Sequence, residues 1–220
     1  MVTEKHDKSS AAGRRRRSGD TATRILDSAE KLVQTRGFNG FSYADVAAEL
    51  GVTKASLHYH FAGKTELAHA LITRYAERFS AALEQFETRL TAGPAKLDAY
   101  VGLYADVLRE HRICLCGMLA AEYGTLPEPL RERVIAFFDD NEAWLEHVLE
   151  QGRADGSLRV DAPPRETARL IVSALEGAML VARPYRDVER FHAAATGLLA
   201  TLTPTTSPIG RRKARIDEAV

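Results

Sequence analysis

Apolar residues recur at helical spacing near the start of the chain. They follow an i, i+4, i+7, i+8 pattern, which places them on one face of a helix. Asp20 can cap the N-terminus of this helix, and Gly37 is well placed to end it in a left-handed conformation. The residues on the apolar face are Ile25, Ala29, Leu32 and Val33.

Two short helical segments follow. Ser42 and Asp45 have the spacing of a capping box, which predicts a helix over residues 43–50. Gly51 then breaks the chain, and Thr53 can cap a second helix of two turns. Two short helices joined by a tight turn that contains glycine form a helix-turn-helix. The pattern therefore predicts a small three-helix unit at the front of the chain.

The remainder of the chain also favours helix. After Gly63 a long amphipathic helix is expected, and Gly-Pro and Pro-Pro breakers separate the later segments. No alternating strand pattern is present, so an all-α fold is expected. The later helices are predicted at about 95–111, 113–123, 129–153, 165–182 and 188–202. The expected organisation is a disordered basic arm (1–19), a front domain (20–65), a larger helical domain (66–203) and a disordered tail (204–220).

Composition restricts the class of protein. The chain has 220 residues, 45% of them hydrophobic, which is ample for a packed core. It has neither a run of about 18 apolar residues nor an apolar signal-peptide segment, so a cytoplasmic protein without a membrane span is expected. Cys114 and Cys116 are too few for a four-ligand zinc site and too close for a structural disulfide. No metal or cofactor is expected.

Charge is distributed unevenly along a chain whose formal net charge is zero. Residues 1–65 carry 11 Lys and Arg against 7 Asp and Glu, a net charge of +4, and the remaining residues carry 19 against 23, a net charge of −4. A polyanion is therefore expected to meet the front of the chain. The run from Arg14 to Arg17 is either a solvated tail or an arm that follows DNA.

The third helix combines a buried side with an unusually polar one. Leu57 and Phe61 are four residues apart and are expected to face the first two helices, together with Val52. The other side suits DNA, because it offers a cation for phosphate and hydroxyl and ring groups for base edges. A metal site at His58 and His60 is disfavoured, since residues i and i+2 diverge by about 200° on a helix. The outward residues are Lys54, Ala55, Ser56, His58 and Tyr59.

The segment FSYADVAAELGVTKASLHYHFAGKTEL, residues 41–67, resembles the DNA-binding signature of TetR/AcrR-type transcriptional regulators. That signature has a G-V-[ST]-x-x-x-[LI]-x-x-[HY]-F core followed by K-x-x-L, and the resemblance extends over about 21–71. It implies a homodimer that reads a palindromic DNA operator, with a C-terminal domain that binds a small-molecule effector and dimerises. One departure concerns base preference, because the family most often has Tyr where His58 stands.

The resemblance implies roles for individual residues of the front domain. Ser42 and Tyr43 approach the DNA backbone, the outward side of the third helix faces the major groove, and Lys64 holds a phosphate. His60 is instead expected to pack, partly buried, between the third helix and the first. The candidate DNA-binding residues are Ser42, Tyr43, Thr53, Lys54, Ser56, His58, Tyr59, His60 and Lys64.

The segment ICLCGMLAAEYG, residues 113–124, is the candidate effector site. Cys114, Met118 and Glu122 share one face of a continuous helix. The segment is similar to C-L-x(3)-L-[AS]-A-E in a subset of the family, some members of which respond to electrophiles or oxidants through the cysteine. A helix N-terminus and nearby cations would lower the pKa of Cys114. Alternatively, both cysteines are small buried hydrophobes.

Reversible binding of an apolar or aromatic effector is the favoured alternative to thiol chemistry. The residues expected around such a ligand, some of them plain core, are Tyr104, Cys114, Met118, Glu122, Phe137, Phe138 and Trp144. A repressor is the favoured function, and an activator of the same fold stays open. An enzyme that uses Cys114, His111 and Glu122 is disfavoured, because no phosphate loop or oxyanion turn accompanies them.

The last two helices are the expected dimer contact, because small and apolar residues line one side of each. Two such helices from each chain can form a four-helix bundle. The alternative is that both faces are buried within one chain. The residues concerned are Leu170, Ile171, Ala174, Leu175, Ala178, Met179 and Ala182 in the first helix, and Phe191, Ala194, Ala195, Leu198, Leu199 and Leu202 in the second.

Overall fold

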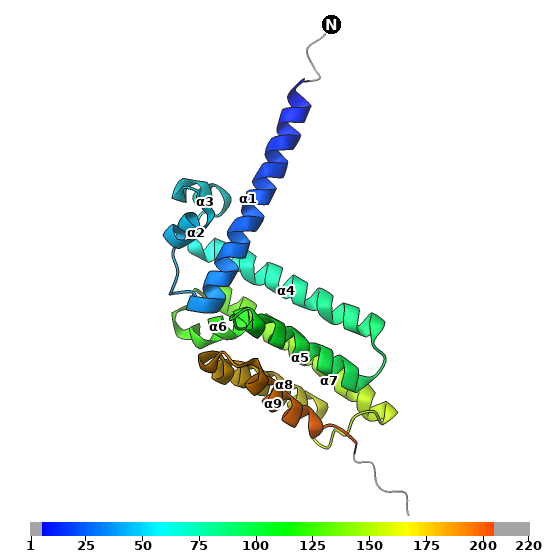
Figure 1. Ribbon diagram of the computed structural model, residues 1–220. Helices are drawn as coiled ribbons and strands as arrows, with labels where there is room; N and C mark the ends of the chain where they lie inside the picture. Colours follow the sequence, from blue (N-terminus) through cyan, green and yellow to red (C-terminus); the bar gives the residue numbers. More distant parts are fainter. Residues whose placement is uncertain (1–5, 205–220) are drawn as a thin grey trace, which may run out of the picture.

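The computed structural model describes the backbone of residues 6–204 and the side chains of residues 19–204. Its described residues are helical, with no strand among them, which confirms the all-α prediction (Figure 1). The helices are α1 (His6–Arg36), α2 (Tyr43–Leu50), α3 (Lys54–His60), α4 (Lys64–Arg89), α5 (Gly93–Arg109), α6 (Leu115–Ala121), α7 (Glu128–Asp155), α8 (Pro164–Ala182) and α9 (Val188–Ala200). Two short 3₁₀ turns, η1 (Tyr123–Thr125) and η2 (Arg183–Tyr185), follow α6 and α8.

Helix α1 begins earlier than the sequence predicts. Its backbone is helical from His6, whereas a disordered arm was expected as far as residue 19 and a cap at Asp20. Alanine and arginine have high helix propensity, so the segment before Asp20 can continue the helix. The side chains of Arg14 to Arg17 lie outside the described residues, as does the tail after Pro204, and the expectations for both stay predictions.

The front helices form where the local signals place them. The Ser42 hydroxyl and the Asp45 carboxylate form the expected capping box at the start of α2. Gly51 ends this helix with a φ of 66°, a left-handed conformation that glycine adopts without a steric penalty. The Thr53 hydroxyl caps α3. Leu57 is fully buried in a core cluster that also includes residues of α1 and α2, so the outward side of α3 is fixed by the packing of its inward side.

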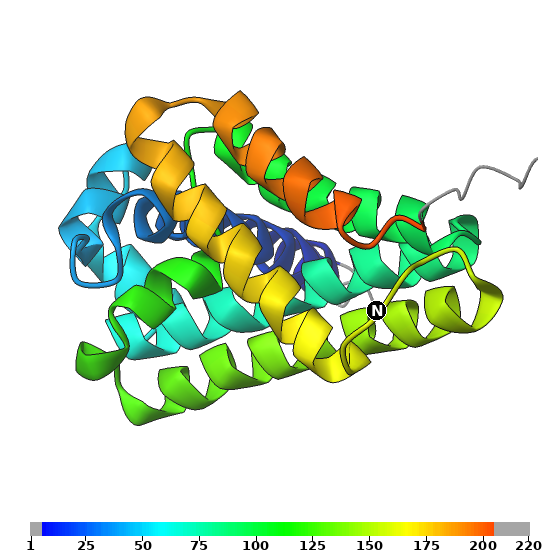
Figure 2. The same cartoon turned by 90° about the horizontal axis from the view of Figure 1, so that it is seen from below.

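The back domain is a bundle in which α7 packs against α4, α5, α6 and α8. Figure 2 shows the molecule from below, with α8 and α9 in front of the other helices. Helix α4 belongs to both parts of the molecule, because Leu67 is buried near the front helices while Leu83 is buried in the bundle. None of the described helices is long and apolar enough to cross a membrane.

Candidate DNA interface and effector site

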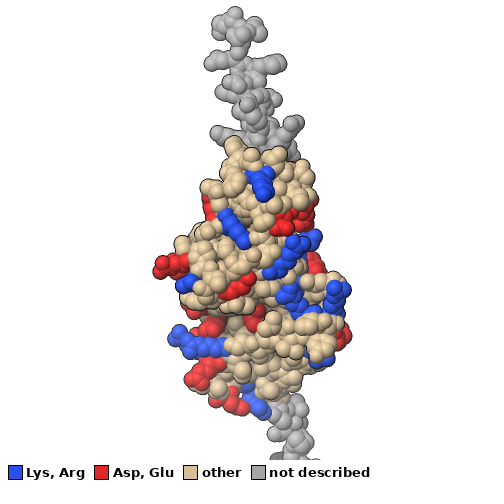
Figure 3. All heavy atoms as spheres, turned by 90° about the vertical axis from the view of Figure 1, so that its left-hand side faces the viewer, with Lys and Arg blue, Asp and Glu red and all other residues tan. Residues whose placement is uncertain are grey.

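The outward side of α3 is open to solvent. Lys54, His58 and Tyr59 are exposed, and Tyr59 keeps 81% of its surface accessible. Ser56 is half-buried, and its backbone N–H donates to the Thr53 hydroxyl over 3.2 Å. A tyrosine ring that keeps most of its surface exposed is available for a partner. Figure 3 shows this side of the molecule, where Lys and Arg side chains are scattered over a largely uncharged surface.

Tyr43 supports α3 from the adjacent helix. Its hydroxyl donates to the Phe61 carbonyl over 3.0 Å, and its ring lies 4.8 Å from the ring of His58. Burial, followed by the charge of Glu66, raises the pKa of Tyr43 to about 12. His58 is held further by a 3.1 Å contact between Nδ1 and the Ala62 carbonyl. The two rings thus form a preorganised pair at the edge of α3.

His60 differs from its neighbours on α3. The side chain is half-buried, as expected, and its ring meets the Tyr59 ring edge-on at 5.1 Å. This contact orients the exposed tyrosine. No group of three or more His, Cys, Asp or Glu side chains in the described part of the chain is placed to hold a metal ion.

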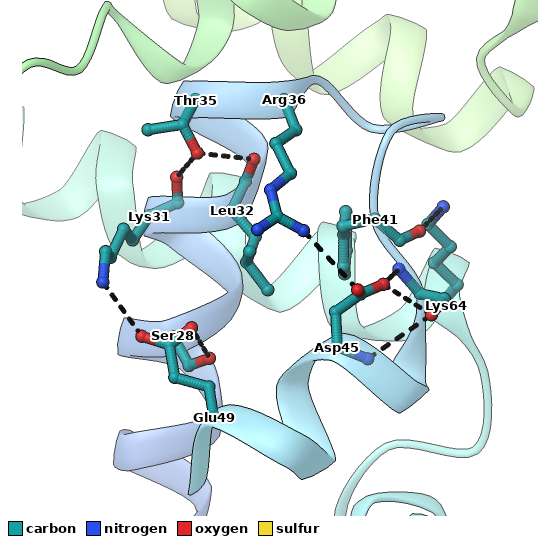
Figure 4. A network of polar contacts seen from close by, with 10 residues as sticks. Ser28, Lys31, Leu32, Thr35, Arg36, Phe41, Asp45, Glu49 and Lys64 are labelled. Carbon is teal, nitrogen blue, oxygen red and sulfur yellow. Dashed lines mark hydrogen bonds and ion pairs between the residues drawn. The ribbon is translucent and has the colours of Figure 1, made fainter.

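Lys64 points into the front domain. Its ammonium donates to the Phe41 carbonyl over 2.6 Å and lies 4.5 Å from the ring centroids of both Phe38 and Phe41 (Figure 4). Burial lowers the pKa of Lys64, while the carboxylates of Glu122 and Asp45 act in the opposite direction. Lys64 therefore supports the turn between α1 and α2. The phosphate contact that the resemblance implies stays a prediction.

Side-chain contacts fasten α2 to α1. Glu49 accepts hydrogen bonds from Ser28 over 3.0 Å and from Lys31 over 3.1 Å (Figure 4). Arg36 reaches the Asp45 carboxylate at 3.5 Å. Exposed ion pairs of this kind contribute little individually, but several of them on one pair of helices restrict their relative rotation. The helix-turn-helix is thus presented as a rigid unit.

An aromatic cluster fills the bundle between α4, α5 and α7. Tyr104 and Phe137 belong to it, and Phe138 lies at its side with its ring 5.5 Å from Phe137, while their contact with an effector stays a prediction. A polar chain runs through the cluster from the Tyr104 hydroxyl to that of Tyr100 at 3.2 Å, and from there to the Asn141 Oδ1 at 3.1 Å. Tyr75 and Phe79 of α4 also belong to the cluster.

Cys114 lies at the start of α6, as expected. Its surroundings, however, are apolar and acidic, whereas nearby cations were predicted. The side chain is 2% exposed, and its sulfur accepts from the Gly117 N–H at 3.4 Å and from the Tyr75 hydroxyl at 3.7 Å. Burial and the neighbouring carboxylate of Glu176 raise the pKa of Cys114 well above its usual value. The predicted lowering by a helix N-terminus and nearby cations is therefore wrong.

Glu176 is the residue that the sequence analysis missed. Its carboxyl group from α8 lies against Gly117, where an added Cβ would come within 2.1 Å of Oε2. Its Oε1 is buried and has no hydrogen-bond partner among the described residues. Burial raises the pKa of Glu176 to about 7, although a hydrogen bond with Cys114 lowers it somewhat. The signal that could have revealed it is the single acidic residue within the apolar run SALEGAML.

Glu122 faces the front domain and not Cys114 and Met118. Its carboxylate accepts from the backbone N–H of Phe38 over 2.5 Å and from that of Asn39 over 3.3 Å. Helix α6 ends at Ala121 and a 3₁₀ turn follows, so the expected continuous helical face does not include Glu122. The grouping of Glu122 with the effector residues is wrong, and the residue joins the two domains instead.

The three residues of the enzyme alternative do not form a site. His111 is exposed, with a left-handed φ of 58°. Cys114 is buried at the Tyr75 hydroxyl, and Glu122 is bound to the backbone of the front domain. These surroundings differ, so a nucleophile, a base and an orienting carboxylate are not assembled here.

Helices α8 and α9 bury part of the predicted dimer surface within the chain. Ile171, Leu175, Met179 and Ala182 are buried in the core, as are Phe191 and Ala195, so their assignment to a dimer contact is wrong. The outward face carries Leu170, Leu180 and Val181, each more than half exposed, with Gly177 between them. Ala193, Ala194 and Gly197 are exposed on α9. Such a contiguous apolar face of small and branched residues permits close helix approach.

The fold and the exposed third helix define a helix-turn-helix DNA-binding protein with a separate helical domain. Residues 25–71 match the family described as bacterial regulatory proteins, tetR family, and residues 93–198 match the tetracyclin repressor-like C-terminal domain. The chain belongs to the TetR family of transcriptional regulators, as the resemblance predicted. The activity expected of it is therefore regulation of transcription.

Several known proteins are similar to the chain over most of its length. A TetR-family regulator from Agrobacterium tumefaciens is 33% identical with a TM-score of 0.82, covering 85% of this chain and 100% of its own. The reduced form of NemR from Escherichia coli is 26% identical with a TM-score of 0.74, covering 84% and 99%. The repressor DhaR from a Mycobacterium species is 21% identical and covers 84% of this chain and 93% of its own.

Proposed function

We propose that this chain is a ligand-responsive repressor that binds a palindromic operator as a homodimer in the cytoplasm. The observation that carries the proposal is the open face of α3, where Lys54, His58 and Tyr59 project from a rigid three-helix head. A cation for phosphate beside a histidine and a tyrosine for base edges suits the major groove. The similar proteins DhaR and NemR are named as repressors, which supports repression over activation.

Dimerisation through the outward faces of α8 and α9 completes the proposed DNA reader. Leu180 and Val181 leave 56% of their surfaces exposed in the single chain, and burying them favours association. The two recognition helices of the dimer would then enter successive major grooves, about 34 to 36 Å apart. A change in this separation weakens binding to both half-sites at once.

The head is attached to the body at the ends of α6, which provides a route for control. Glu122 follows α6 and holds the backbone of Phe38, while Arg112 precedes α6 and donates to Gln34 of α1 over 3.0 Å. A ligand that moves α6 therefore acts on both contacts. It releases DNA only to the extent that it binds the released arrangement more tightly.

A small apolar or aromatic molecule is the effector that the aromatic cluster favours. A thiol-reactive effector remains in the proposal, because Cys114 lies beside that cluster. Its burial and raised pKa mean that reagents reach the thiolate only after local opening. Reversible binding is therefore the proposed main route.

Fluorescence anisotropy on the DNA upstream of the chain's own gene tests the proposal at one fixed salt concentration. Wild-type protein is expected to bind this DNA specifically, and Tyr59→Ala to bind it about tenfold more weakly with unchanged helical content. Tyr123→Ala is the matched control, because this exposed tyrosine lies away from α3. Equal weakening by both variants would contradict the assignment of α3 as the DNA reader.

The same assay tests the thiol route. Addition of a mild thiol-reactive compound to wild type and to Cys114→Ser separates thiol chemistry from other effects. Release of the wild type alone supports a sensor cysteine, whereas release of neither or of both supports reversible effectors.

A further inference from the structure

A cavity of about 330 Å³ opens between α4 and α7. Its inner wall is aromatic, with Phe79 and Phe137 meeting edge to face at 5.2 Å and Trp144 beside them. The Trp144 ring is stacked on Tyr100 at 5.6 Å, which fixes its orientation. The cavity therefore offers a rigid apolar surface large enough for one aromatic ring.

The rim of this cavity is acidic. Glu84 and Asp140 are exposed on its two sides, and Glu87 lies deeper and half-buried. No Lys or Arg is among the described residues that line it. The cation paired with Glu87 is Lys96, which is 4% exposed and donates to Glu87 over 2.5 Å and to Gln151 over 3.1 Å, so it is already engaged. The rim thus carries more negative charge than its surroundings compensate.

Two residues that line the cavity each carry a buried polar atom without a partner among the described residues. These atoms are Oε1 of Glu87 and Nε1 of Trp144. Buried polar atoms are normally hydrogen-bonded, so a ligand in the cavity can satisfy this acceptor and this donor once their side chains shift toward it. The acceptor belongs to a carboxylate, which favours a charged donor over a neutral one.

We propose that this cavity binds an organic cation with an aromatic body, such as an aryl-alkyl ammonium compound. This inference rests on the function proposed above and specifies the class of its effector. The ammonium group would meet Glu84 and Asp140 at the rim, near the carboxylate of Glu87, while the ring packs on the aromatic wall. An ammonium over an aromatic face gains roughly two- to thirtyfold in affinity. An anion of the same shape is rejected by three carboxylates.

The position of the cavity connects it with the rest of the molecule. Phe79 separates it from the polar chain inside the bundle, with ring centroids 5.9 Å from Tyr100 and 6.3 Å from Tyr104. Helix α4 carries Phe79 and also Lys64, which supports the head. A ligand at this wall therefore acts on a helix that belongs to both domains.

Trp144 is the single tryptophan of the chain, so its fluorescence reports directly on the cavity. Full-length protein is titrated with 4-phenylbutylamine, 4-phenylbutanol and 4-phenylbutanoate, which share a ring and a linker and differ in charge. The amine is expected to give a saturable change. The alcohol is expected to bind roughly tenfold more weakly, and the carboxylate more weakly still. Equal affinity for the amine and the alcohol would overturn the proposal.

Variants locate the binding site. The double variant Glu84→Gln, Asp140→Asn removes two rim charges from exposed positions and is expected to weaken amine binding roughly fivefold to tenfold while leaving alcohol binding unchanged. The matched control is Glu77→Gln, Glu132→Gln, which removes two exposed charges from the same helices outside the cavity. Equal weakening in the two double variants would show a general charge effect and contradict the site.

The two proposals fail in different assays. Operator binding measured without any amine tests the repressor, whereas the fluorescence titration without DNA tests the cavity. Amine binding by a protein that ignores its operator would uphold the site and contradict the repressor. Operator binding without amine binding would uphold the repressor and contradict the amine site.

Discussion

The carboxylate of Glu122 accepts a 2.5 Å hydrogen bond from the backbone N–H of Phe38, 84 positions earlier in the chain. The contact joins the end of α6 to the turn that follows α1. A carboxylate that accepts backbone N–H groups is a strong, charge-assisted acceptor. Together with the contact between Arg112 and Gln34 at the other end of α6, this side chain links the two domains.

Replacement of Glu122 by Ala is expected to loosen this joint. Loss of hydrogen bonds to a charged acceptor costs about 1 to 3 kcal/mol of unfolding free energy, because the Phe38 and Asn39 amides lose their acceptor. Urea denaturation measures the loss, and hydrogen exchange should show both amides exchanging faster. Glu128→Ala, at an exposed position of α7, is the control. Unchanged exchange at Phe38 would disprove the role of this contact.

Lys54 and Lys64 are expected to behave differently on DNA, although both are lysines of the head. Lys54→Ala should weaken operator binding and reduce the salt dependence by about one phosphate contact, with little effect on stability. Lys64→Ala should mainly lower the unfolding free energy, because its ammonium holds the Phe41 carbonyl between two rings. Binding isotherms at several salt concentrations, beside urea curves, separate the two roles. If both variants changed the salt dependence of operator binding equally, this division of roles between Lys54 and Lys64 would be contradicted.

Glu176 should make stability depend on pH. Its pKa in the folded chain is raised from 4.5 to about 7, so the folded state keeps a proton that the unfolded state has lost. Stability is therefore expected to fall as pH rises between these two values, by at most about 3 kcal/mol, and to stay level above them.

The urea midpoint measured across this range tests the role of Glu176. In Glu176→Gln the urea midpoint should depend less on pH. Its stability relative to the wild type should be greatest at high pH, where the wild type carries the buried charge. Glu166→Gln, exposed on the same helix, serves as the control and should retain the profile of the wild type. A wild-type profile in Glu176→Gln would show that another group is responsible.

Leu180→Glu should dissociate the proposed dimer without unfolding the chain. The side chain is 56% exposed in the single chain, so a carboxylate is tolerated there, but burying it against a partner costs several kcal/mol. Sedimentation equilibrium is expected to show at least tenfold weaker association. Ile135→Glu, at a 47% exposed position on α7, should leave association intact. A dimer that survives Leu180→Glu would place the interface elsewhere.

The sequence predicts the head more accurately than the body. The elements of the head depend on local signals, such as the reciprocal bonds of Ser42 and Asp45 and the left-handed Gly51, which operate within a few residues. The outward side of α3 follows from the inward position of Leu57 alone. For these residues, spacing along the chain is enough to give position in space.

The interior of the body depends on partners that are distant in sequence. Glu176 is adjacent to Cys114 only because α8 packs beside α6. The sequence around Cys114 shows the preceding cations Arg109, His111 and Arg112 but no carboxylate of α8. Helix α6 also ends sooner than its apolar pattern suggests, which turns Glu122 toward the head. The sign of the shift in Cys114 pKa could not be predicted without this packing.

The contact made by Glu122 also bears on how such a protein can change through evolution. The carboxylate accepts hydrogen bonds from backbone N–H groups, which are present whatever the side chains at positions 38 and 39. Gly37 is the constrained position, since its φ is 84° and a Cβ there would lie 2.6 Å from the carboxylate. A DNA-binding domain with a different sequence preference can therefore be joined to this C-terminal domain, provided that its turn after α1 has glycine at position 37.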